Sequence, residues 1–176
     1  MKLYLPDIDQ TTQRLSYEEP TKALNARLAH GGVCDYELPG NAVVDVQYYR
    51  SGVEIFLWGT VSGQAIGHCA RCLESYTFDL RKDFSLVLVP EETLPARLAL
   101  TEDDLDLVYY RGEEIDVTPL VDEQIILALP TKPLCREECR GLCPQCGANL
   151  NSESCCCQPQ KGDPRWAVLR QLKLDL

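Results

Sequence analysis

Hydrophobic residues in the first half of the chain recur in short runs that are typical of β-strands. Between residues 41 and 90 the runs VVDVQYY, VEIFLWGTVSGQAIGHC and YTFDLRKDFSLVLV are rich in β-branched and aromatic residues, and Gly and Ser residues interrupt them. Such runs at hairpin intervals predict an antiparallel meander that curls into an open barrel. Two shorter extended stretches are expected at residues 2–5 and 14–18, and a turn is expected at residues 50–52.

Helical signals are fewer. The segment ALNARLA follows Thr21, a candidate N-cap, and the glycines after His30 end it. Thr118 and Pro119 open a second helix that stops before Pro130, and its buried side chains are expected to be Leu120, Val121, Ile125, Leu127 and Leu129. A third helix is expected after Asp163-Pro164, with Trp166, Leu169 and Leu172 on one stripe.

A hairpin is expected just before the second helix. The runs LVYY and EIDV flank Arg111-Gly112, and short β-prone runs on either side of such a turn predict that the two pair with each other.

Composition describes an ordinary soluble globular protein. The chain has 176 residues, of which 45% are hydrophobic and 25% charged, so it can form one domain with a small appendage. It contains no apolar run long enough to span a membrane, and its start, MKLYLPDID, lacks the features of an export signal. We therefore expect a cytoplasmic protein with reduced thiols and no membrane partner.

Charge is distributed unevenly along the chain. The net charge is −10, and residues 91–123 carry eleven acidic against two basic side chains. This acidic segment is either a solvated loop with a hairpin or a docking face for a basic partner. The overall sign disfavours a bare RNA-binding protein, because it repels phosphate.

Cysteines dominate the next part of the chain. Residues 131–157 contain seven cysteines and few large apolar side chains, so burial alone cannot fold them. In Cys143-Pro-Gln-Cys146-Gly147, two thiolates separated by two residues form a knuckle that directs both sulfurs toward one Zn²⁺. A structural zinc site needs two more ligands.

The remaining cysteines allow two zinc sites. A C-x-C pair can bind through both sulfurs, so Cys155 and Cys157 complete the knuckle and Cys156 is left over. The upstream pair Cys69-Ala-Arg-Cys72 then closes a second site with Cys135 and Cys139. The sequence equally allows a second pairing, in which one site combines Cys135, Cys139, Cys143 and Cys146 and the other combines Cys69, Cys72, Cys155 and Cys157.

Other cysteine chemistry and catalysis are less well supported. Iron–sulfur ligation is an alternative, but a knuckle with Pro and Gly suits zinc at least as well. A thioredoxin-like role for Cys69 and Cys72 lacks the βαβ context. The chain has two histidines, no nucleophile elbow and no phosphate-binding lysine loop, so we expect no enzyme activity, no small-molecule substrate and structural metal only.

Several ordered motifs resemble one known family. They are Cys69-Ala-Arg-Cys72-Leu73, EQIILALPTKPLC, the run from Cys135 through Cys146 to Asn151, the CCC group and Asp163-Pro-Arg165-Trp-Ala-Val-Leu. Together, over residues 65–172, they resemble the YceD family, the bacterial and plastid large ribosomal RNA subunit accumulation proteins. The resemblance implies a non-enzymatic cytoplasmic factor that is needed for 23S rRNA accumulation and large-subunit assembly.

The implied function sets expectations for the partner. An acidic body could hold a basic large-subunit ribosomal protein, and the metal-stiffened tail, which has net charge +2 from residue 131 onward, could touch rRNA in the immature particle. The candidate partner-binding residues are Asp103, Asp104, Asp106, Arg140, Arg165 and Trp166. The alternatives are a sequence-tolerant RNA-binding zinc module and a redox or metal-sensing module.

The fold class we expect is therefore α+β. Residues 1–130 form a β-rich body, a curled antiparallel sheet with a few helices, and residues 131–176 form the zinc-binding cysteine cluster and the C-terminal helix.

Overall fold

A computed structural model of the chain describes residues 1–30, 35–91 and 107–158. Three long antiparallel strands form its centre: β4 (Ala42–Ser51), β5 (Glu54–His68) and β6 (Ser75–Pro90). They follow the three hydrophobic runs of residues 41–90, so the predicted meander is confirmed. The expected turn is also present, with Gly52 at φ 63° between β4 and β5.

Three further strands complete the main sheet. The edge strands are β2 (Gln13–Glu19), which pairs with β4, and β7 (Leu107–Tyr110), which pairs with β6, while the short β3 (Tyr36–Glu37) pairs with one end of β5. A second sheet pairs β1 (Lys2–Tyr4) with β8 (Glu114–Asp116), and a 3-10 turn (Leu5–Asp7) follows β1. Among the described residues the main sheet remains open, because β2 and β7 do not pair with each other.

The hairpin predicted around Arg111-Gly112 is wrong. The LVYY run forms β7, which runs parallel to β6, and the EIDV run supplies β8, which pairs with β1 instead. The register places Ile115 opposite Leu3, and both side chains are buried in the core. Pairing with the N-terminal strand thus buries an apolar pair, and backbone bonds from Leu5 N–H to Glu113 O (2.9 Å) and from Val117 N–H to Met1 O (2.8 Å) flank it.

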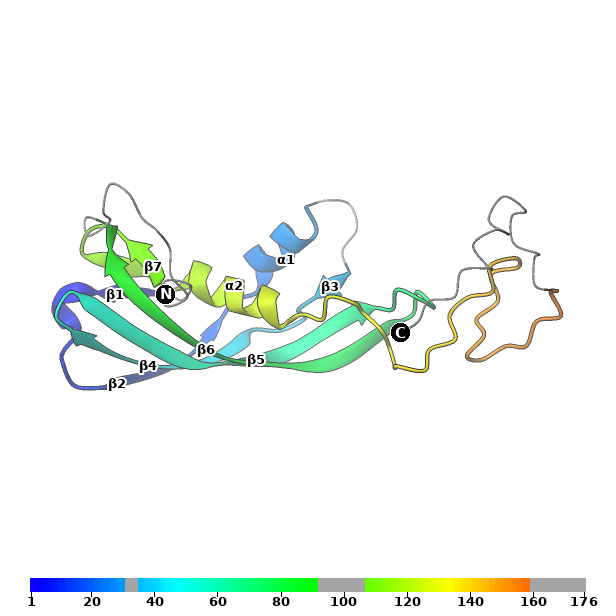
Figure 1. The fold of residues 1–176 in the computed structure, drawn as a ribbon, viewed down its shortest axis with the longest axis horizontal. Coiled ribbons are helices and arrows are strands. Elements are labelled where there is room, and N and C mark those ends of the chain that lie inside the picture. The colour runs from blue at the N-terminus through cyan, green and yellow to red at the C-terminus, as the bar shows by residue number, and fades with distance from the viewer. Residues whose placement is uncertain (31–34, 92–106, 159–176) are drawn as a thin grey trace, which may run out of the picture.

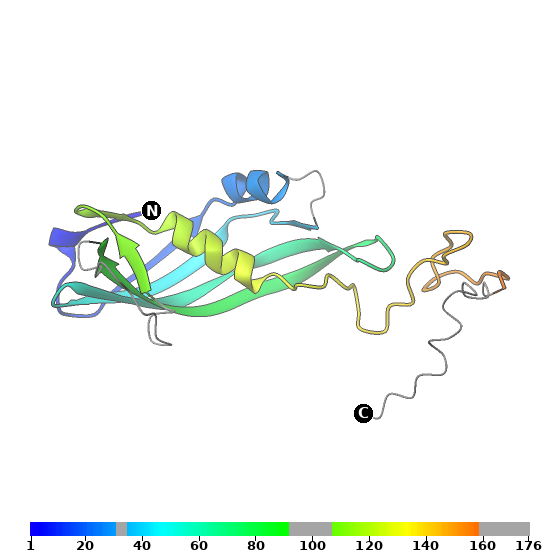
Figure 2. The same cartoon turned by 45° about the horizontal axis from the view of Figure 1, so that its top comes forward.

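The helices lie on one side of the sheet. Helix α1 (Lys22–Leu28) and helix α2 (Thr118–Ala128) lie on the same face of the main sheet, and α2 contacts β5 and β6 (Figure 1). Turning the molecule shows α2 lying across the long strands (Figure 2). The core fills the space between this face and the helices, and its fully buried side chains include Leu24, Val44, Leu57, Val61 and Ile125.

Both described helices depart from their predicted details. Thr21 precedes α1 but does not cap it, because its hydroxyl donates to the carbonyls of Leu38 (3.2 Å) and Gly40 (2.9 Å). In α2 the side chain of Leu127 is 68% exposed, contrary to the prediction, since at 100° per residue it lies on the opposite side from Val121 and Ile125. The helix ends at Ala128, before Pro130, as expected.

The helix predicted after Asp163 lies outside the described residues. Among the residues that the structure describes, no helix is long and apolar enough to cross a membrane.

Candidate metal centres

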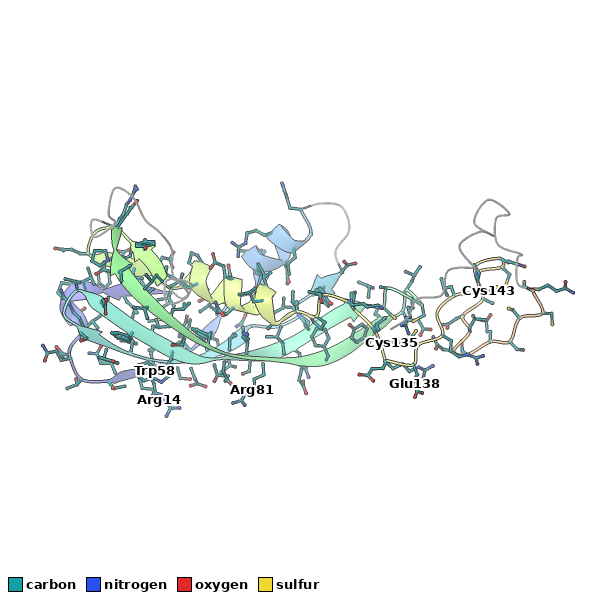
Figure 3. All side chains as sticks on the ribbon, in the orientation of Figure 1. Arg14, Trp58, Arg81, Cys135, Glu138 and Cys143 are labelled. Atoms are coloured by element: carbon teal, nitrogen blue, oxygen red, sulfur yellow. The ribbon has the colours of Figure 1, made fainter. Side chains whose placement is uncertain are left out.

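The first group of thiols joins the end of the sheet to the cysteine segment. Cys69 and Cys72 lie in the turn between β5 and β6, and Cys135 and Cys139 lie after α2 (Figure 3). All four sulfurs lie within 4.8 Å of one another. Three of these side chains are buried and Cys135 is half-buried, so the group is closed to solvent on most sides.

The spacing of these sulfurs fits a four-coordinate metal. Four sulfurs at about 2.3 Å from a tetrahedral Zn²⁺ lie about 3.8 Å from one another. The distance from Cys69 Sγ to Cys139 Sγ is 3.7 Å, and that from Cys72 Sγ to Cys135 Sγ is also 3.7 Å. The donor set is all thiol, which suits zinc in a closed structural site and leaves no open position for substrate.

Backbone hydrogen bonds build the turn that carries Cys69 and Cys72. The Cys69 N–H donates to Glu74 O at 2.9 Å, and the Leu73 N–H donates to Cys69 O at 2.9 Å. Leu73 adopts a positive φ of 62°, which lets the chain reverse directly after the second cysteine. The Ala70 N–H donates to Pro133 O at 2.8 Å and so ties the turn to the segment that brings the partner cysteines.

Local dipoles favour one thiolate in this group and oppose a second. Burial raises the pKa of Cys69, but N–H groups of Cys135, Cys72 and Arg71 outweigh it and lower that pKa to about 6. The Glu74 N–H lowers the pKa of Cys72, yet burial and the neighbouring thiols raise it to about 12. Mutual repulsion of thiolates is what a bound cation relieves, so the site is arranged to hold positive charge.

The second group lies farther along the cysteine segment. Cys143, Cys146, Cys155 and Cys157 have all four sulfurs within 4.8 Å of one another. Cys143 is buried, whereas Cys146 and Cys157 are exposed, so this group is more open to solvent than the first. N–H groups of Cys146 and Gln145 lower the pKa of Cys143 to about 6, and the Cys146 thiol raises that of Cys157 to about 12.

The knuckle around Cys143 has the geometry that its sequence predicts. The Gly147 N–H donates to Cys143 O at 2.9 Å, and the Cys143 N–H donates to Ala148 O at 2.8 Å. Gly147 adopts a φ of 74°, where a residue with a Cβ is strained. The glycine after the second cysteine is therefore what closes the turn and exposes N–H groups to the Cys143 sulfur.

Asn151 connects the two groups. Its side-chain N–H donates to Cys139 Sγ at 3.3 Å and to Asn149 Oδ1 at 3.0 Å, and its Oδ1 accepts the Arg140 N–H at 2.9 Å. The hydrogen bond from Asn151 lowers the pKa of Cys139. A residue between the ligands of the second group thus stabilises a thiolate of the first.

Arg71 and Gly141 form a second connection. The Arg71 guanidinium donates to the carbonyls of Glu137 (3.0 Å) and Cys139 (2.9 Å), and Arg71 O accepts the Leu142 N–H at 3.1 Å. Gly141 lies so close to Arg71 that an added Cβ would stand 3.0 Å from Arg71 O. Its φ of 73° adds a second reason for glycine at this position.

Of the two pairings that the sequence allowed, the structure shows the first. The groups are Cys69, Cys72, Cys135 and Cys139, and Cys143, Cys146, Cys155 and Cys157; Cys156 belongs to neither. The nine cysteines that the structure describes are all free thiols. Sequence reasoning missed Asn151 and Arg71, because their roles depend on which cysteines are brought beside them.

Of the candidate partner residues, only Arg140 lies within the described part of the chain, where its side chain is exposed. Asp103, Asp104, Asp106, Arg165 and Trp166 lie outside the described residues, and so does the stretch 92–106 of the acidic segment.

Comparison with known proteins gives one family. The family model described as "Large ribosomal RNA subunit accumulation protein YceD" matches residues 57–173, a range that contains both cysteine groups. No solved structure shows a significant match to the chain.

Three relatives illustrate the similarity. A protein of Mycobacterium tuberculosis is 36% identical over 120 residues, which cover 67% of this chain and 55% of the relative. Chloroplastic YCED homolog 1 is 28% identical over 164 residues in Arabidopsis thaliana (80% of this chain, 51% of the relative) and 32% identical over 143 residues in Zea mays (67% and 49%). Both plant proteins are named large ribosomal RNA subunit accumulation proteins. The chain spans about half the length of these curated relatives, at 49% to 55%.

Proposed function

The chain belongs to the YceD family, and from this we propose that it is a non-enzymatic factor needed for the accumulation of 23S rRNA and for large ribosomal subunit assembly. The observation that carries the proposal is the family match, which extends across both cysteine groups. The two plant relatives are named for large ribosomal RNA subunit accumulation, which supports the proposal. We propose that the protein acts in the cytoplasm, where the ribosomes of a bacterial cell are assembled.

We propose that each cysteine group binds one structural Zn²⁺. The sulfur spacing of 3.7 Å in the first group supports this, and so does the lack of enough large buried side chains to fold residues 131–158 otherwise. When bound, zinc supplies positive charge that holds the thiolates together. Asn151 and the backbone N–H groups orient the sulfurs, and the hydrogen bonds of Arg71 hold the cysteine segment against the end of the sheet.

The two zinc sites define the units of the protein. Residues 1–130 form a body that can fold by hydrophobic burial, and residues 131–176 form the metal-dependent unit, although the first site takes Cys69 and Cys72 from the body. We propose that this arrangement holds the cysteine segment at one end of the sheet, so that the two units contact the immature particle together. The particle's rRNA or a basic large-subunit protein would be the direct partner.

The proposal is tested in cells that lack the gene. We expect a lower ratio of 23S to 16S rRNA and fewer mature large subunits in a sucrose gradient, restored by the wild-type chain. Cys69→Ser should restore neither, whereas the matched variant Cys156→Ser should restore both, because Cys156 lies outside both groups. An unchanged 23S to 16S ratio in the deletion strain would refute the proposed function.

A further inference from the structure

One broad face of the main sheet has no helix on it. Helices α1 and α2 lie on one side, and Arg14, Trp58 and Arg81 lie on the other, where no described element covers the sheet (Figure 3). Side chains alternate between the faces of a strand, and the strand register therefore fixes which residues share this open face. On β5 they include Phe56, Trp58, Thr60 and Ser62, which alternate with the core residues Ile55, Leu57 and Val61.

Three aromatic rings form a cluster at one end of this open face. The rings of Tyr49 and Phe56 are stacked, with centroids 5.2 Å apart and planes 11° apart, and Trp58 meets Tyr49 edge to face at 5.8 Å. All three side chains remain partly exposed. Ordered, partly exposed aromatic rings offer surfaces on which nucleobases stack, and every base has a suitable π-face.

A hollow of about 430 Å³ lies beside this cluster. The strand register gives one row across it, in which Arg14, Gln47 and Trp58 stand opposite one another on β2, β4 and β5. The next row contributes Asp45, Thr60 and Asp83, and the one after it Ser62 and Arg81. The hollow is therefore lined by hydrogen-bonding side chains next to a tryptophan.

The hollow has positive side chains at two corners and carboxylates between them. Arg14 and Arg81 are exposed at opposite corners, and neither has an ion pair or side-chain hydrogen bond within the described part of the chain. From the spacing of strands and residues, their Cα atoms are on the order of 20 Å apart, which a few extended nucleotides span. Asp45 and Asp83 lie between them, and Asp83 accepts a hydrogen bond from Thr60 Oγ1 at 2.5 Å.

We propose that this open face, with the Tyr49–Phe56–Trp58 cluster at one end and the neighbouring hollow beside it, binds a short stretch of single-stranded RNA. Bases would stack on the aromatic cluster, the guanidiniums of Arg14 and Arg81 would contact phosphates, and the carboxylates between them would accept hydrogen bonds from base amino groups. The identification of the strand as unpaired rRNA rests on the proposed function.

The charges of the hollow give a basic peptide no net attraction. An arginine- or lysine-rich segment would be attracted by Asp45 and Asp83 but repelled by Arg14 and Arg81, and these four charges sum to zero. The net charge of −10 repels RNA at long range, so binding depends on these two local cations and weakens as the salt concentration rises. The open face thus differs from the acidic segment, where we expect basic partners.

Intrinsic fluorescence tests the proposal directly. The chain has two tryptophans, so in a Trp166→Phe background, with excitation at a wavelength that tyrosine does not absorb, the tryptophan signal comes from Trp58 alone. Full-length zinc-loaded protein is titrated with 12-nucleotide oligo(U) and oligo(A) and, separately, with an arginine-rich peptide of matched length. We expect both RNAs to quench Trp58 and the peptide to leave it unchanged.

Matched variants locate the binding. Trp58→Leu should weaken RNA binding by roughly 5- to 150-fold, and Trp58→Phe should retain most of it, because one aromatic ring can replace another in stacking. Fluorescence anisotropy of labelled RNA measures both variants. Tyr4→Leu is the aromatic control, since Tyr4 is exposed but belongs to the two-stranded sheet.

The arginines give an independent test, because both are exposed and their replacement leaves the core intact. Arg14→Gln and Arg81→Gln should each reduce the slope of log Kd against log salt by about 0.7. Lys22→Gln, which removes one positive charge from α1 on the other side of the sheet, should leave the slope unchanged. Circular dichroism confirms that each variant is folded.

Two results would overturn the RNA-binding face. One is RNA affinity that is equal in wild type, Trp58→Leu and both arginine variants; the other is quenching of Trp58 by the peptide but not by RNA. Either result leaves the proposed function standing if the deletion strain still loses 23S rRNA. An unchanged 23S level together with RNA binding at this face would instead refute the proposed function alone.

Discussion

The sheet body and the cysteine segment are held together by different forces. In the body, the buried side chains are mainly Leu, Val and Ile, and they pack between one face of the sheet and two helices. In residues 131–158, the buried positions are mainly Cys, Gly and Pro, while Leu134 and Leu142 are only partly buried. Hydrophobic burial therefore stabilises the first region, and we propose that metal binding by the thiol groups stabilises the second.

Metal removal should produce the largest difference between the two regions, because only the cysteine segment is expected to unfold. We expect chelation of zinc to unfold residues 131–158 while the sheet stays folded, because structural zinc contributes on the order of 10 kcal/mol to small sites. Limited proteolysis with mass spectrometry reads both regions in one sample: early cleavage should be confined to the cysteine segment. Early cleavage within β4, β5 and β6 would show that the body also depends on metal.

Single cysteine variants sharpen the same comparison. Cys143→Ser should lower the zinc content from two ions to one per chain and expose the knuckle, because the second group loses a ligand. Cys156→Ser is the matched control and should keep two ions. Native mass spectrometry measures the zinc content, and two ions in Cys143→Ser would contradict the ligand assignment.

A core substitution should destabilise the sheet body and leave the cysteine segment unaffected. Leu57 is fully buried on β5, so Leu57→Ala should lower the free energy of unfolding of the body by about 2–5 kcal/mol. The zinc content should not change. Leu127→Ala, at an exposed position of α2, should cost less than about 0.5 kcal/mol. Urea denaturation followed by far-UV circular dichroism compares the two variants.

The connection between the two groups predicts a smaller effect. Asn151→Ala removes the donor to Cys139 Sγ and the acceptor for Arg140 N–H, so zinc affinity at the first site should fall about 10- to 100-fold. Competition with a chromophoric chelator measures this affinity. The neighbouring Ser152→Ala removes only a long contact of 3.5 Å and should match the wild type. Equal affinities for all three proteins would show that the groups are independent.

The two left-handed glycines of the cysteine segment offer the finest test. Gly141→Ala and Gly147→Ala both place a Cβ at positive φ, which costs about 1–2 kcal/mol. Only Gly141→Ala also presses on Arg71 O, whereas the space around Gly147 is open. Gly141→Ala should therefore weaken zinc retention more than Gly147→Ala, as measured by the rate of zinc transfer to a chelator. Faster zinc transfer from Gly147→Ala than from Gly141→Ala would show that the contact with Arg71 does not hold the cysteine segment in place.

Periodicity and spacing determined a large part of this protein. The alternation of apolar and polar residues specified β4, β5 and β6, since a period of two fits only a strand with one buried face. The knuckle at Cys143 could also be read locally, because its turn, its glycine and its N–H donors lie within a few residues.

Only the tertiary structure decided the long-range partners. Whether Cys69 and Cys72 join Cys135 and Cys139 depends on where the β5–β6 turn lies relative to the end of α2. The spacing of cysteines in the sequence does not determine that position. The same reason explains why β8 pairs with β1 and not with β7: burial of Ile115 beside Leu3 exists only in the folded chain. Local patterns arise from neighbours in sequence, whereas pairing, burial and the open face of the sheet arise from residues that folding brings together.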